Sequence, residues 1–208
     1  MQSAWLGEVV YEEALRLQRL LVDRRVAEQS DDVLLTLTHD RVYTAGRHAD
    51  LGRNLLGTRP DIRVVEVDRG GDLTYHGPGQ LVGYPIFDLR PHRCDVHQYV
   101  RDLESALIIA VLEFGIYGCR VHGHTGVWVG PTGLEEKLAA IGVRISRWIT
   151  SHGFALNVSV DLQHFRYIVP CGIPDRGVTS IEKLIGRGVP MREAEDAVEL
   201  GFRRMFGV

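Results

Sequence analysis

The chain of 208 residues lacks long apolar runs and a strong net charge. No apolar stretch approaches the roughly 20 residues that a membrane-spanning helix needs, so we do not expect a membrane protein. Residues 1–15 lack a basic region followed by an apolar core, which argues against a signal peptide. The net charge of −3 gives no indication of binding to nucleic acid or to an anionic membrane.

Cysteine is also scarce, and its spacing excludes two kinds of site. The three cysteines, Cys94, Cys119 and Cys171, form no CxxC pair, which argues against a disulfide scaffold and a thiolate zinc site. A reducing cytoplasm fits this composition best. His122 and His124 stand two residues apart without a third ligand nearby, so we expect no metal.

The length of 208 residues allows one large domain or two small ones. Because no clear linker is present, we expect a single domain over residues 1–208, with an α+β fold. Leu15, Leu17, Leu20, Leu21 and Val22 predict an amphipathic helix over 11–29. A second helix over 95–114 has Asp95 as its cap and Gly115 at its end. Other expected helices cover 180–184 and 192–205, and expected strands cover 33–39, 63–68, 81–89, 118–122, 125–130, 136–148 and 152–160. Because helices and strands mix without a regular βαβ period, a mixed sheet with flanking helices is favoured over a doubly wound one.

Residues 69–85, RGGDLTYHGPGQLVGYP, form the most informative segment. Five glycines and two prolines predict a shaped loop that brings backbone close to a ligand. Arg69 suits a carbonyl or carboxylate, although a structural salt bridge explains it equally well. His76 suits a role as a donor or ligand-orienting group, and a hydrogen-bonded turn residue is the alternative. His39 and His152 carry the same ambiguity.

Lysine is the rarest basic residue, because 22 of the 24 basic residues are arginine. Arginine does not deprotonate in proteins, so Lys137 suggests a need for a group that can lose a proton. A solvated lysine at a strand edge is the alternative. Cys171 lies in VPCGIP, where proline and glycine predict a tight turn, and a helix beginning at Ser180 would favour its thiolate. A buried, inert cysteine is the alternative there, and Cys94 and Cys119 lack such a context.

Several segments together resemble the lipoyl(octanoyl) transferases, the octanoyl-[acyl-carrier-protein]:protein N-octanoyltransferases. They are THDRVYTAGR at 38–47, RGGDLTYHGPGQLVGYP at 69–85, EKLAAIGVRISR at 136–147, SHGFALNV at 151–158 and VPCGI at 169–173. The resemblance implies the fold of the biotin and lipoate protein ligase catalytic domains, an α+β domain around a mixed sheet.

The resemblance also implies an activity and its residues. Cys171 would take an octanoyl group from acyl carrier protein as a thioester, and Lys137 would act as acid and base. His39 and Tyr11, with His152 as a further candidate, would approach the acyl chain. The residues implied to contact substrate are Arg69, Gly70, Gly71, Asp72, Leu73, Thr74, Tyr75, His76, Ala140, Ile141, Gly142, Gly153, Phe154 and Ala155. Among these, Leu73, Tyr75, Ile141 and Phe154 are expected to line an apolar slot.

The implied partners are octanoyl-acyl carrier protein as donor, with lipoyl domains of 2-oxoacid dehydrogenase E2 subunits and the glycine-cleavage H protein as acceptors. We expect a monomer. We also expect no cofactor and no need for ATP, because transfer from thioester to amide is downhill and no GxxxxGK[ST] loop is present. Since acyl carrier proteins are acidic, Arg47, Arg53, Arg59 and Arg63 are candidates for a docking patch.

Rival interpretations stay open. An ATP-dependent lipoate or biotin ligase would share the fold and a key lysine, but would not need Cys171. An amidotransferase acting between lipoyl proteins is a closer variant. A non-enzymatic carrier-binding or lipid-binding module leaves Lys137 and Cys171 unexplained. A papain-like hydrolase is disfavoured because its cysteine precedes its histidine in the chain and carries another signature.

Overall fold

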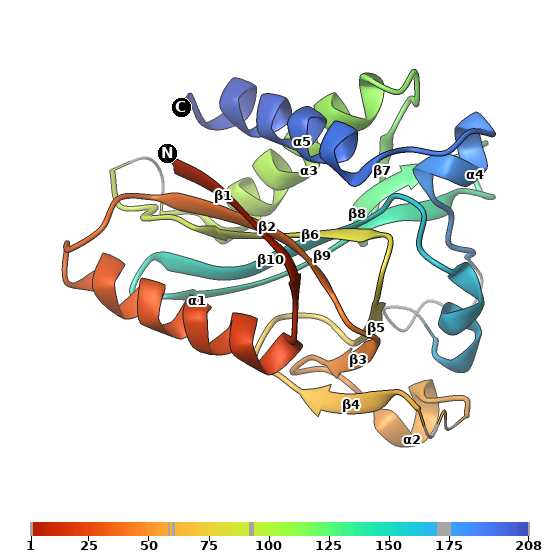
Figure 1. Ribbon diagram of the computed structural model, residues 1–208, viewed down its shortest axis with the longest axis horizontal. Helices are drawn as coiled ribbons and strands as arrows, with labels where there is room; N and C mark the ends of the chain where they lie inside the picture. Colours follow the sequence, from red (N-terminus) through yellow and green to blue (C-terminus); the bar gives the residue numbers. More distant parts are fainter. Residues whose placement is uncertain (1, 58, 60, 92–93, 170–175, 208) are drawn as a thin grey trace.

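The computed structural model describes residues 2–57, 59, 61–91, 94–169 and 176–207. These residues form a large sheet and a small one with helices packed around them (Figure 1). The large sheet has seven strands in the order β1 (Gln2–Val9), β2 (Val33–His39), β6 (Gln80–Ile86), β10 (Ile149–Asn157), β9 (Glu136–Ser146), β8 (His124–Val129) and β7 (Cys119–Val121). β1 and β2 run parallel, and each other neighbouring pair runs antiparallel. The predicted α+β fold with a mixed sheet is therefore confirmed.

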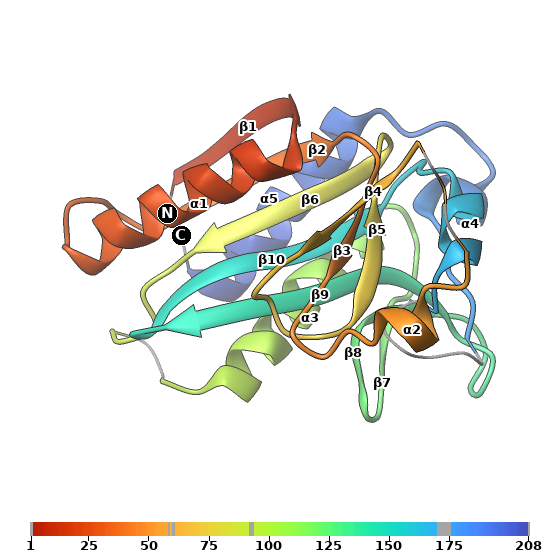
Figure 2. The same ribbon diagram turned by 90° about the horizontal axis from the view of Figure 1, so that it is seen from below.

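The helices cover both faces of the large sheet (Figure 2). α1 (Tyr11–Val26) packs on one face, and α3 (Val96–Leu112) packs with α5 (Met191–Phe206) on the other. Alternation along β2 divides the core: Leu34 belongs to the cluster under α3 and α5, and Leu35 to the cluster under α1. A strand covered on both faces buries side chains on both sides, which explains why VLLTL at 33–37 is apolar except for the buried Thr36.

The small sheet lies on the same side as α1, across β9 and β10 (Figure 2). Its order is β4 (Arg63–Glu66), β3 (Val42–Ala45) and β5 (Leu73–His76). Its own apolar cluster includes Tyr43, Leu73, Tyr75 and Phe165. The short helices α2 (Leu51–Asn54) and η1 (Leu162–Tyr167) flank this sheet, and α4 (Ile181–Ile185) follows later in the chain. The facing sides of the two sheets are where the candidate site lies.

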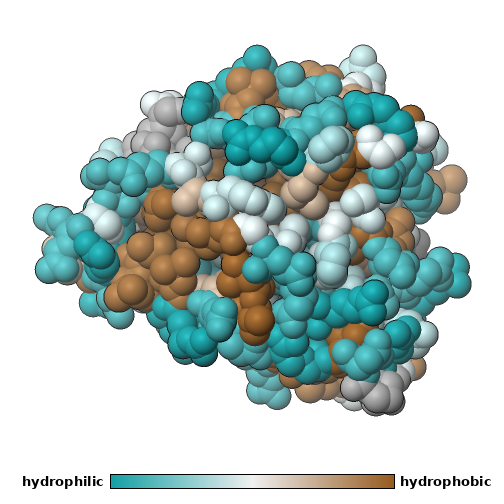
Figure 3. Space-filling model, viewed as in Figure 1, coloured by the Kyte–Doolittle hydropathy of each residue, from teal (hydrophilic) through white to brown (hydrophobic). Residues whose placement is uncertain are grey.

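The helical predictions agree closely with the structure. The Asp95 side chain accepts a hydrogen bond from the Gln98 N–H at 3.0 Å, which confirms the cap of α3. Gly115 follows the end of this helix with φ +71°, as expected for a terminating glycine. The predicted apolar stripe of α1 is partly wrong, because Leu20 is 56% exposed. Hydrophobic residues gather on the side of the molecule where α1 lies (Figure 3).

The strand predictions missed β1, β3 and β5. Residues 69–85 are not one long loop: they contain β5, a tight turn at 77–79 and most of β6. Gly79 has φ +84° at this turn, and its carbonyl accepts hydrogen bonds from the backbone of Val158 and Ser159. The described residues include no helix with the length and apolarity needed to cross a membrane.

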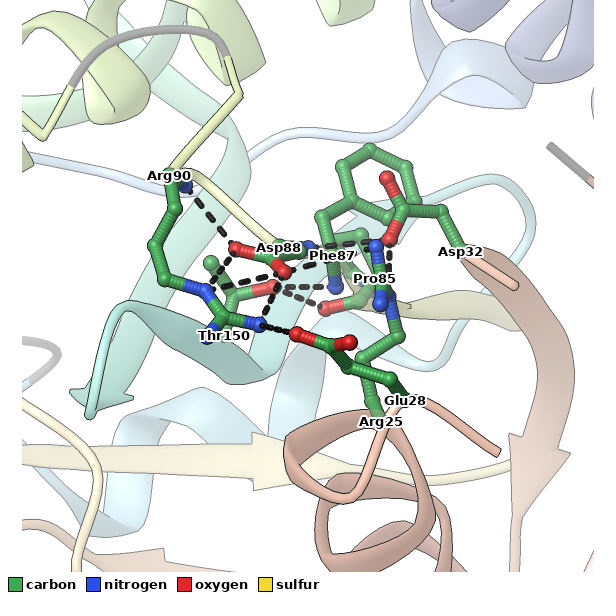
Figure 4. A network of polar contacts seen from close by, with 8 residues as sticks. All are labelled: Arg25, Glu28, Asp32, Pro85, Phe87, Asp88, Arg90 and Thr150. Carbon is green, nitrogen blue, oxygen red and sulfur yellow. Dashed lines mark hydrogen bonds and ion pairs between the residues drawn. The ribbon is translucent and has the colours of Figure 1, made fainter. Parts of the chain in front are cut away.

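A buried polar network ties α1 to the large sheet at one end (Figure 4). Asp88 is buried and accepts hydrogen bonds from the Arg90 guanidinium at 2.6 to 3.0 Å, which lowers the pKa of its carboxyl. Arg25, near the end of α1, bonds Asp32 at 2.7 Å and lies 3.5 Å from Asp88. Thr150 bridges the ends of β6 and β10 by donating to the Pro85 carbonyl and accepting from the Phe87 N–H. This end of α1 is thereby fixed on the sheet.

Candidate active site

A cavity of about 460 Å³, counting its open mouth, lies between the two sheets and α1. Its lining contains most of the residues predicted to contact substrate. These are Arg69, Gly71, Asp72, Thr74, His76, Ala140, Ile141, Gly142, Gly153, Phe154 and Ala155, joined by Tyr11 and His152. Segments that are distant in sequence are therefore brought to one place.

Leu73 and Tyr75 do not line this cavity, which corrects their assignment to an apolar slot. They lie on β5, where successive side chains point to opposite faces. Thr74 and His76 face the cavity, whereas Leu73 and Tyr75 enter the cluster beneath η1. Phe154 contributes to the wall, but its ring packs in the main core, with its centroid 5.5 Å from that of Phe202.

Two glycines bring β6 and β10 into close contact beneath the cavity. A Cβ on Gly153 would lie 2.2 Å from the Gly83 carbonyl oxygen, and one on Gly83 would lie 2.1 Å from the Phe154 ring. Atoms at these distances overlap, so neither position has room for a side chain. Gly83 and Gly153 thus serve the close packing of the cavity floor.

Arg69 is a buried cation at the cavity wall. Its guanidinium donates to the Thr44 carbonyl at 2.8 Å, the Thr44 hydroxyl at 2.9 Å and the Gly70 carbonyl at 3.0 Å. The Gly70 N–H donates to the Val143 carbonyl at 2.9 Å, which joins the glycine-rich segment to β9. Gly70 lines a neighbouring opening instead of the cavity itself. A positive charge is therefore held beside closely approaching backbone.

A series of hydrogen bonds runs from His76 through Gln80 and Asn157 to Thr179. Gln80 uses its amide group to donate to the Tyr75 carbonyl at 3.1 Å and to Asn157 Oδ1 at 2.9 Å. Its oxygen therefore accepts from His76 Nδ1 at 2.7 Å, which places the imidazole proton on Nδ1. Asn157 in turn donates to the Thr179 carbonyl at 3.0 Å. One continuous network thus links β5, β6, β10 and residue 179.

A second chain of hydrogen bonds joins His39, Tyr84 and Tyr11. His39 Nδ1 lies 2.7 Å from the Val9 carbonyl, which can only accept, so this nitrogen carries the proton. His39 Nε2 then accepts from the Tyr84 hydroxyl at 2.7 Å, and Tyr84 also bonds Tyr11. His39 is fully buried and does not itself line the cavity. It instead positions Tyr84, which does.

Burial keeps these groups neutral. It lowers the pKa of His39 to about 4 and raises the pKa of Tyr11 to about 12. Burial, together with His39 and Arg69, lowers the pKa of His76 far below its ordinary value. Burial and nearby arginines, with Arg69 foremost, lower the pKa of His152 to about 3. The histidines around the cavity are therefore uncharged at neutral pH.

His152 closes one end of the cavity in an unusual backbone conformation. Its φ of +54° is rare for a residue with a side chain. The backbone N–H donates to Gln18 Oε1 at 2.8 Å, and Nε2 donates to Asp68 Oδ1 at 2.8 Å. Asp68 also pairs with Arg144. The backbone of His152 is therefore held by α1, and its ring is held by the segment preceding Arg69.

Lys137 is 5% exposed, so the alternative of a solvated strand-edge lysine is wrong. It lies on β9 opposite Trp128 of β8, and its Nζ is 4.7 Å from the centre of the indole ring. Gly126 lets β8 lie close to β9 at this point, because a Cβ there would lie 2.5 Å from the Ala139 carbonyl oxygen. Lys137 lines both a small cavity beside Asn157 and a wider opening bounded by Gly70, Ile141 and the start of α3.

Cys171 lies outside the described residues. The chain that follows is bound to Lys137: the Lys137 N–H donates to the Gly177 carbonyl at 2.9 Å, and the Thr179 N–H donates to the Lys137 carbonyl at 3.0 Å. Of the other cysteines, Cys94 is exposed, and Cys119 is half-buried with a pKa raised by burial.

Several residues of this site were not predicted. Val82 and Tyr84 line the cavity, Gln80 and Asn157 form its polar network, and Trp128 contacts Lys137. Gln80 and Tyr84 lie in the glycine-rich segment 69–85, and Asn157 lies in 151–158. Their place in these segments was the only sequence feature that could have indicated a role in the site. Trp128 had no such feature, because its contact with Lys137 depends on strand register.

The predicted basic patch also needs correction. Arg63 is ion-paired with Glu12 and Asp40, and Arg59 is ion-paired with Asp61. Their charges are therefore largely balanced within the chain. No group of three or more metal-ligating side chains occurs within the ranges that the structure describes.

Comparison with known proteins gives relatives over nearly the whole chain. An octanoyltransferase from Caldicellulosiruptor bescii is 45% identical, over 98% of this chain and 90% of that protein. One from Gloeobacter violaceus is 46% identical, over 97% of this chain and 88% of that protein. One from Myxococcus xanthus is 46% identical over 97% of this chain, which spans 58% of that longer protein.

Solved structures share the fold at low sequence identity. A chain from an archaeal lipoylation system of Thermoplasma acidophilum superimposes with a TM-score of 0.74, 17% identity, and coverage of 100% of this chain and 84% of that one. A biotin protein ligase from Aquifex aeolicus superimposes with a TM-score of 0.59 and 16% identity, over 99% of this chain and 70% of that one. The model of the lipoyl protein ligase A/B catalytic domain matches residues 10–203. The chain therefore belongs to the lipoyl protein ligase A/B catalytic domain family, where its curated relatives are octanoyltransferases.

Proposed function

We propose that this acyltransferase moves an octanoyl group from acyl carrier protein to a lysine of a lipoyl domain through a thioester on Cys171. The observation that carries the proposal is the buried Lys137, which lines two openings that share Thr74, Ala140 and Ile141 with the cavity between the sheets. Its backbone is bonded to Gly177 and Thr179, shortly after Cys171 in the sequence. Lys137 and Cys171 are the catalytic residues of the proposal.

In the first step the Cys171 thiolate attacks the carbonyl carbon of the octanoyl thioester. A new carbon–sulfur bond forms, the bond to the carrier sulfur breaks, and the carrier leaves as a thiol after taking a proton from Lys137. Negative charge develops on the carbonyl oxygen during this step. Arg69 and the backbone N–H groups near Gly71 are the candidate groups for stabilising it.

In the second step the ε-amine of the acceptor lysine attacks the acyl-enzyme. Neutral Lys137 takes a proton from the incoming amine, an amide bond forms, and Cys171 leaves as the thiolate. The two steps together require no oxidant, reductant or nucleotide. The acceptors proposed are lipoyl domains of 2-oxoacid dehydrogenase E2 subunits and the glycine-cleavage H protein.

The cavity between the sheets is the proposed place of the acyl chain. Val82, Ile141 and the backbone of Gly153 form apolar parts of its wall. Because His39, His76 and His152 are neutral, no histidine charge opposes an apolar chain there.

Intact-mass spectrometry after mixing with octanoyl-acyl carrier protein tests the proposal. The wild-type protein should gain one octanoyl group, and Cys171→Ala should gain none. Cys94→Ala is the matched control and should be acylated like the wild type, because Cys94 is exposed and lines none of the cavities around Lys137. An adduct that persists in Cys171→Ala and disappears in Cys94→Ala would refute the assignment.

An ATP-dependent ligase is the second candidate, because a structure of lipoate-protein ligase A bound with ATP shares the fold with a TM-score of 0.73 at 15% identity. Incubation with free octanoate, ATP and a lipoyl domain separates the two activities. A ligase would octanoylate the domain and would tolerate Cys171→Ala. The proposed transferase would do neither and would show ping-pong kinetics with the carrier substrate.

A further inference from the structure

A second groove lies beyond His152, between α1 and the end of the β9–β10 hairpin. It encloses about 610 Å³, counting its open side. Arg19 and Asp23 line it from α1, Arg144 and Arg147 from the hairpin, and Asp68 from the segment before the cavity. Three arginines thus stand against two aspartates.

The charges of this groove are only partly balanced within the protein. The Asp68 carboxylate is paired with Arg144 and also accepts a hydrogen bond from His152, so it does not balance a further arginine. Arg19 and Arg147 are exposed, and no ion pair of either side chain is found among the residues that the structure describes. Two guanidinium groups are therefore available at the groove, with Asp23 as the opposing carboxylate.

A buried donor without a partner lies in the same groove. Gln18 is 1% exposed, and its oxygen accepts the His152 N–H, which fixes the orientation of the amide. Its Nε2 has no hydrogen-bond partner among the described residues. A buried N–H group without a hydrogen-bond acceptor destabilises the folded protein, so a ligand whose oxygen accepts from Gln18 would gain binding free energy. Ser146 and Ser151 add hydroxyl groups to the lining.

We propose that this groove is a binding site for a phosphate-type oxyanion. A tetrahedral oxyanion offers several acceptor oxygens, and planar guanidinium groups match them in pairs. Gln18 would supply a neutral donor from below, and Arg19 and Arg147 would supply charge from the two sides. The site is separate from the proposed chemistry: Lys137 and Arg144 are seven residues apart on extended β9, or roughly 23 Å.

Direct titration with inorganic phosphate tests the site without reference to activity. Isothermal calorimetry of the wild-type protein should show saturable binding of one phosphate. The double variant R19Q/R147Q should bind at least tenfold more weakly. Both side chains are exposed, so its thermal unfolding should match that of the wild type. The variant R16Q/R24Q removes the same charge from exposed positions on α1 outside the groove and should bind phosphate normally.

The variant Q18E provides an independent check, because it keeps an oxygen for the His152 N–H and replaces the donor with a negative charge. It should also lose phosphate binding. Absence of saturable binding by the wild type, or equal binding by R19Q/R147Q, would overturn the proposal. Weakening by R16Q/R24Q to the same extent would show a diffuse charge effect and would overturn it too.

Acyl-transfer kinetics then identify the source of the phosphate. One arm uses octanoyl-acyl carrier protein, and the other uses the octanoyl thioester of N-acetylcysteamine, which carries no phosphate. A KM raised in R19Q/R147Q for the carrier alone would assign the groove to a phosphate of the donor. An unchanged KM in both arms, with phosphate binding lost, would assign it to a free phosphorylated molecule.

Discussion

Two buried cations dominate the site at the scale of single residues. Arg69 is 8% exposed and donates to carbonyl and hydroxyl oxygens, and Lys137 is 5% exposed beside the Trp128 ring. Their chemistry differs, because the guanidinium stays charged whereas an ammonium group can release its proton. Arg69 therefore suits permanent stabilisation of a carbonyl oxygen, and Lys137 suits proton transfer.

Lys137→Arg should lower kcat for acyl transfer by about 10²–10⁴, the usual contribution of a general acid or base. The substitution retains positive charge but removes the group that can act as a base. Lys183→Arg is the matched control, since Lys183 is the second lysine of the chain and an exposed partner of Glu136. Steady-state kinetics with both variants, after a check of folding, would measure the effect. Near-normal turnover of Lys137→Arg would mean that the lysine is structural.

At the scale of elements, β6, β9 and β10 form the floor of the cavity, and glycine controls how closely they approach. Gly83 lies opposite Phe154 in the β6–β10 pair, and Gly153 lies opposite Gly142 in the β9–β10 pair. The missing side chains let the Phe154 ring lie over Gly83 and let the cavity reach the backbone. Glycine normally weakens a strand, so its presence here points to these packing demands.

Gly153→Ala should destabilise the protein by about 1–3 kcal/mol, the usual cost of overpacking. The added methyl group would lie 2.2 Å from the Gly83 carbonyl oxygen, which is backbone and cannot rotate away. Urea unfolding at neutral pH measures the change. Gly52→Ala is the control, because the nearest atom to its Cβ would be 3.5 Å away, and its stability should change little. Equal stability of the two variants would contradict the packing argument.

At the scale of the whole molecule, buried histidines with a lowered pKa make stability depend on pH: the three beside the cavity and His164, whose pKa burial also lowers. The pKa of His39 is lowered to about 4, that of His152 to about 3, and that of His76 well below its ordinary value. In the unfolded chain a histidine titrates near pH ~6.5. Between that pH and about 5 the unfolded state therefore takes up protons that the folded state does not.

Stability should consequently fall as the pH drops from 6.5 to 5, by up to about 1.4 kcal/mol per pH unit for each buried histidine. Urea unfolding at several pH values in this window measures the slope. His39→Gln should reduce the slope by one histidine's share, and His48→Gln, at an exposed position, should leave it unchanged. A slope that is flat in the wild-type protein would contradict the buried neutral state.

The amphipathic and capped elements were predictable because their signals are local. Helix α3 follows from its apolar period and from Asp95, and α4 follows from Ser180, whose side chain accepts from the Lys183 N–H at 3.3 Å. β1 and β3 were not predicted. β3 has only four residues, and its assignment depends on partners β4 and β5 that lie far along the chain. Local preference cannot identify a short strand that exists because of such distant pairing.

By itself the sequence determined the fold class, the family resemblance and the segments that contain the site. Glycine, proline and the rare lysine can be recognised from the sequence alone. Glycine and proline have unusual backbone conformations, and lysine, unlike arginine, can lose its proton. The tertiary structure decided which side of each strand faces the cavity. It placed Thr74 and His76 inside, Leu73 and Tyr75 outside, and Trp128 against Lys137. The reason is that strand register and sheet packing arise from contacts between distant segments, which no local pattern contains.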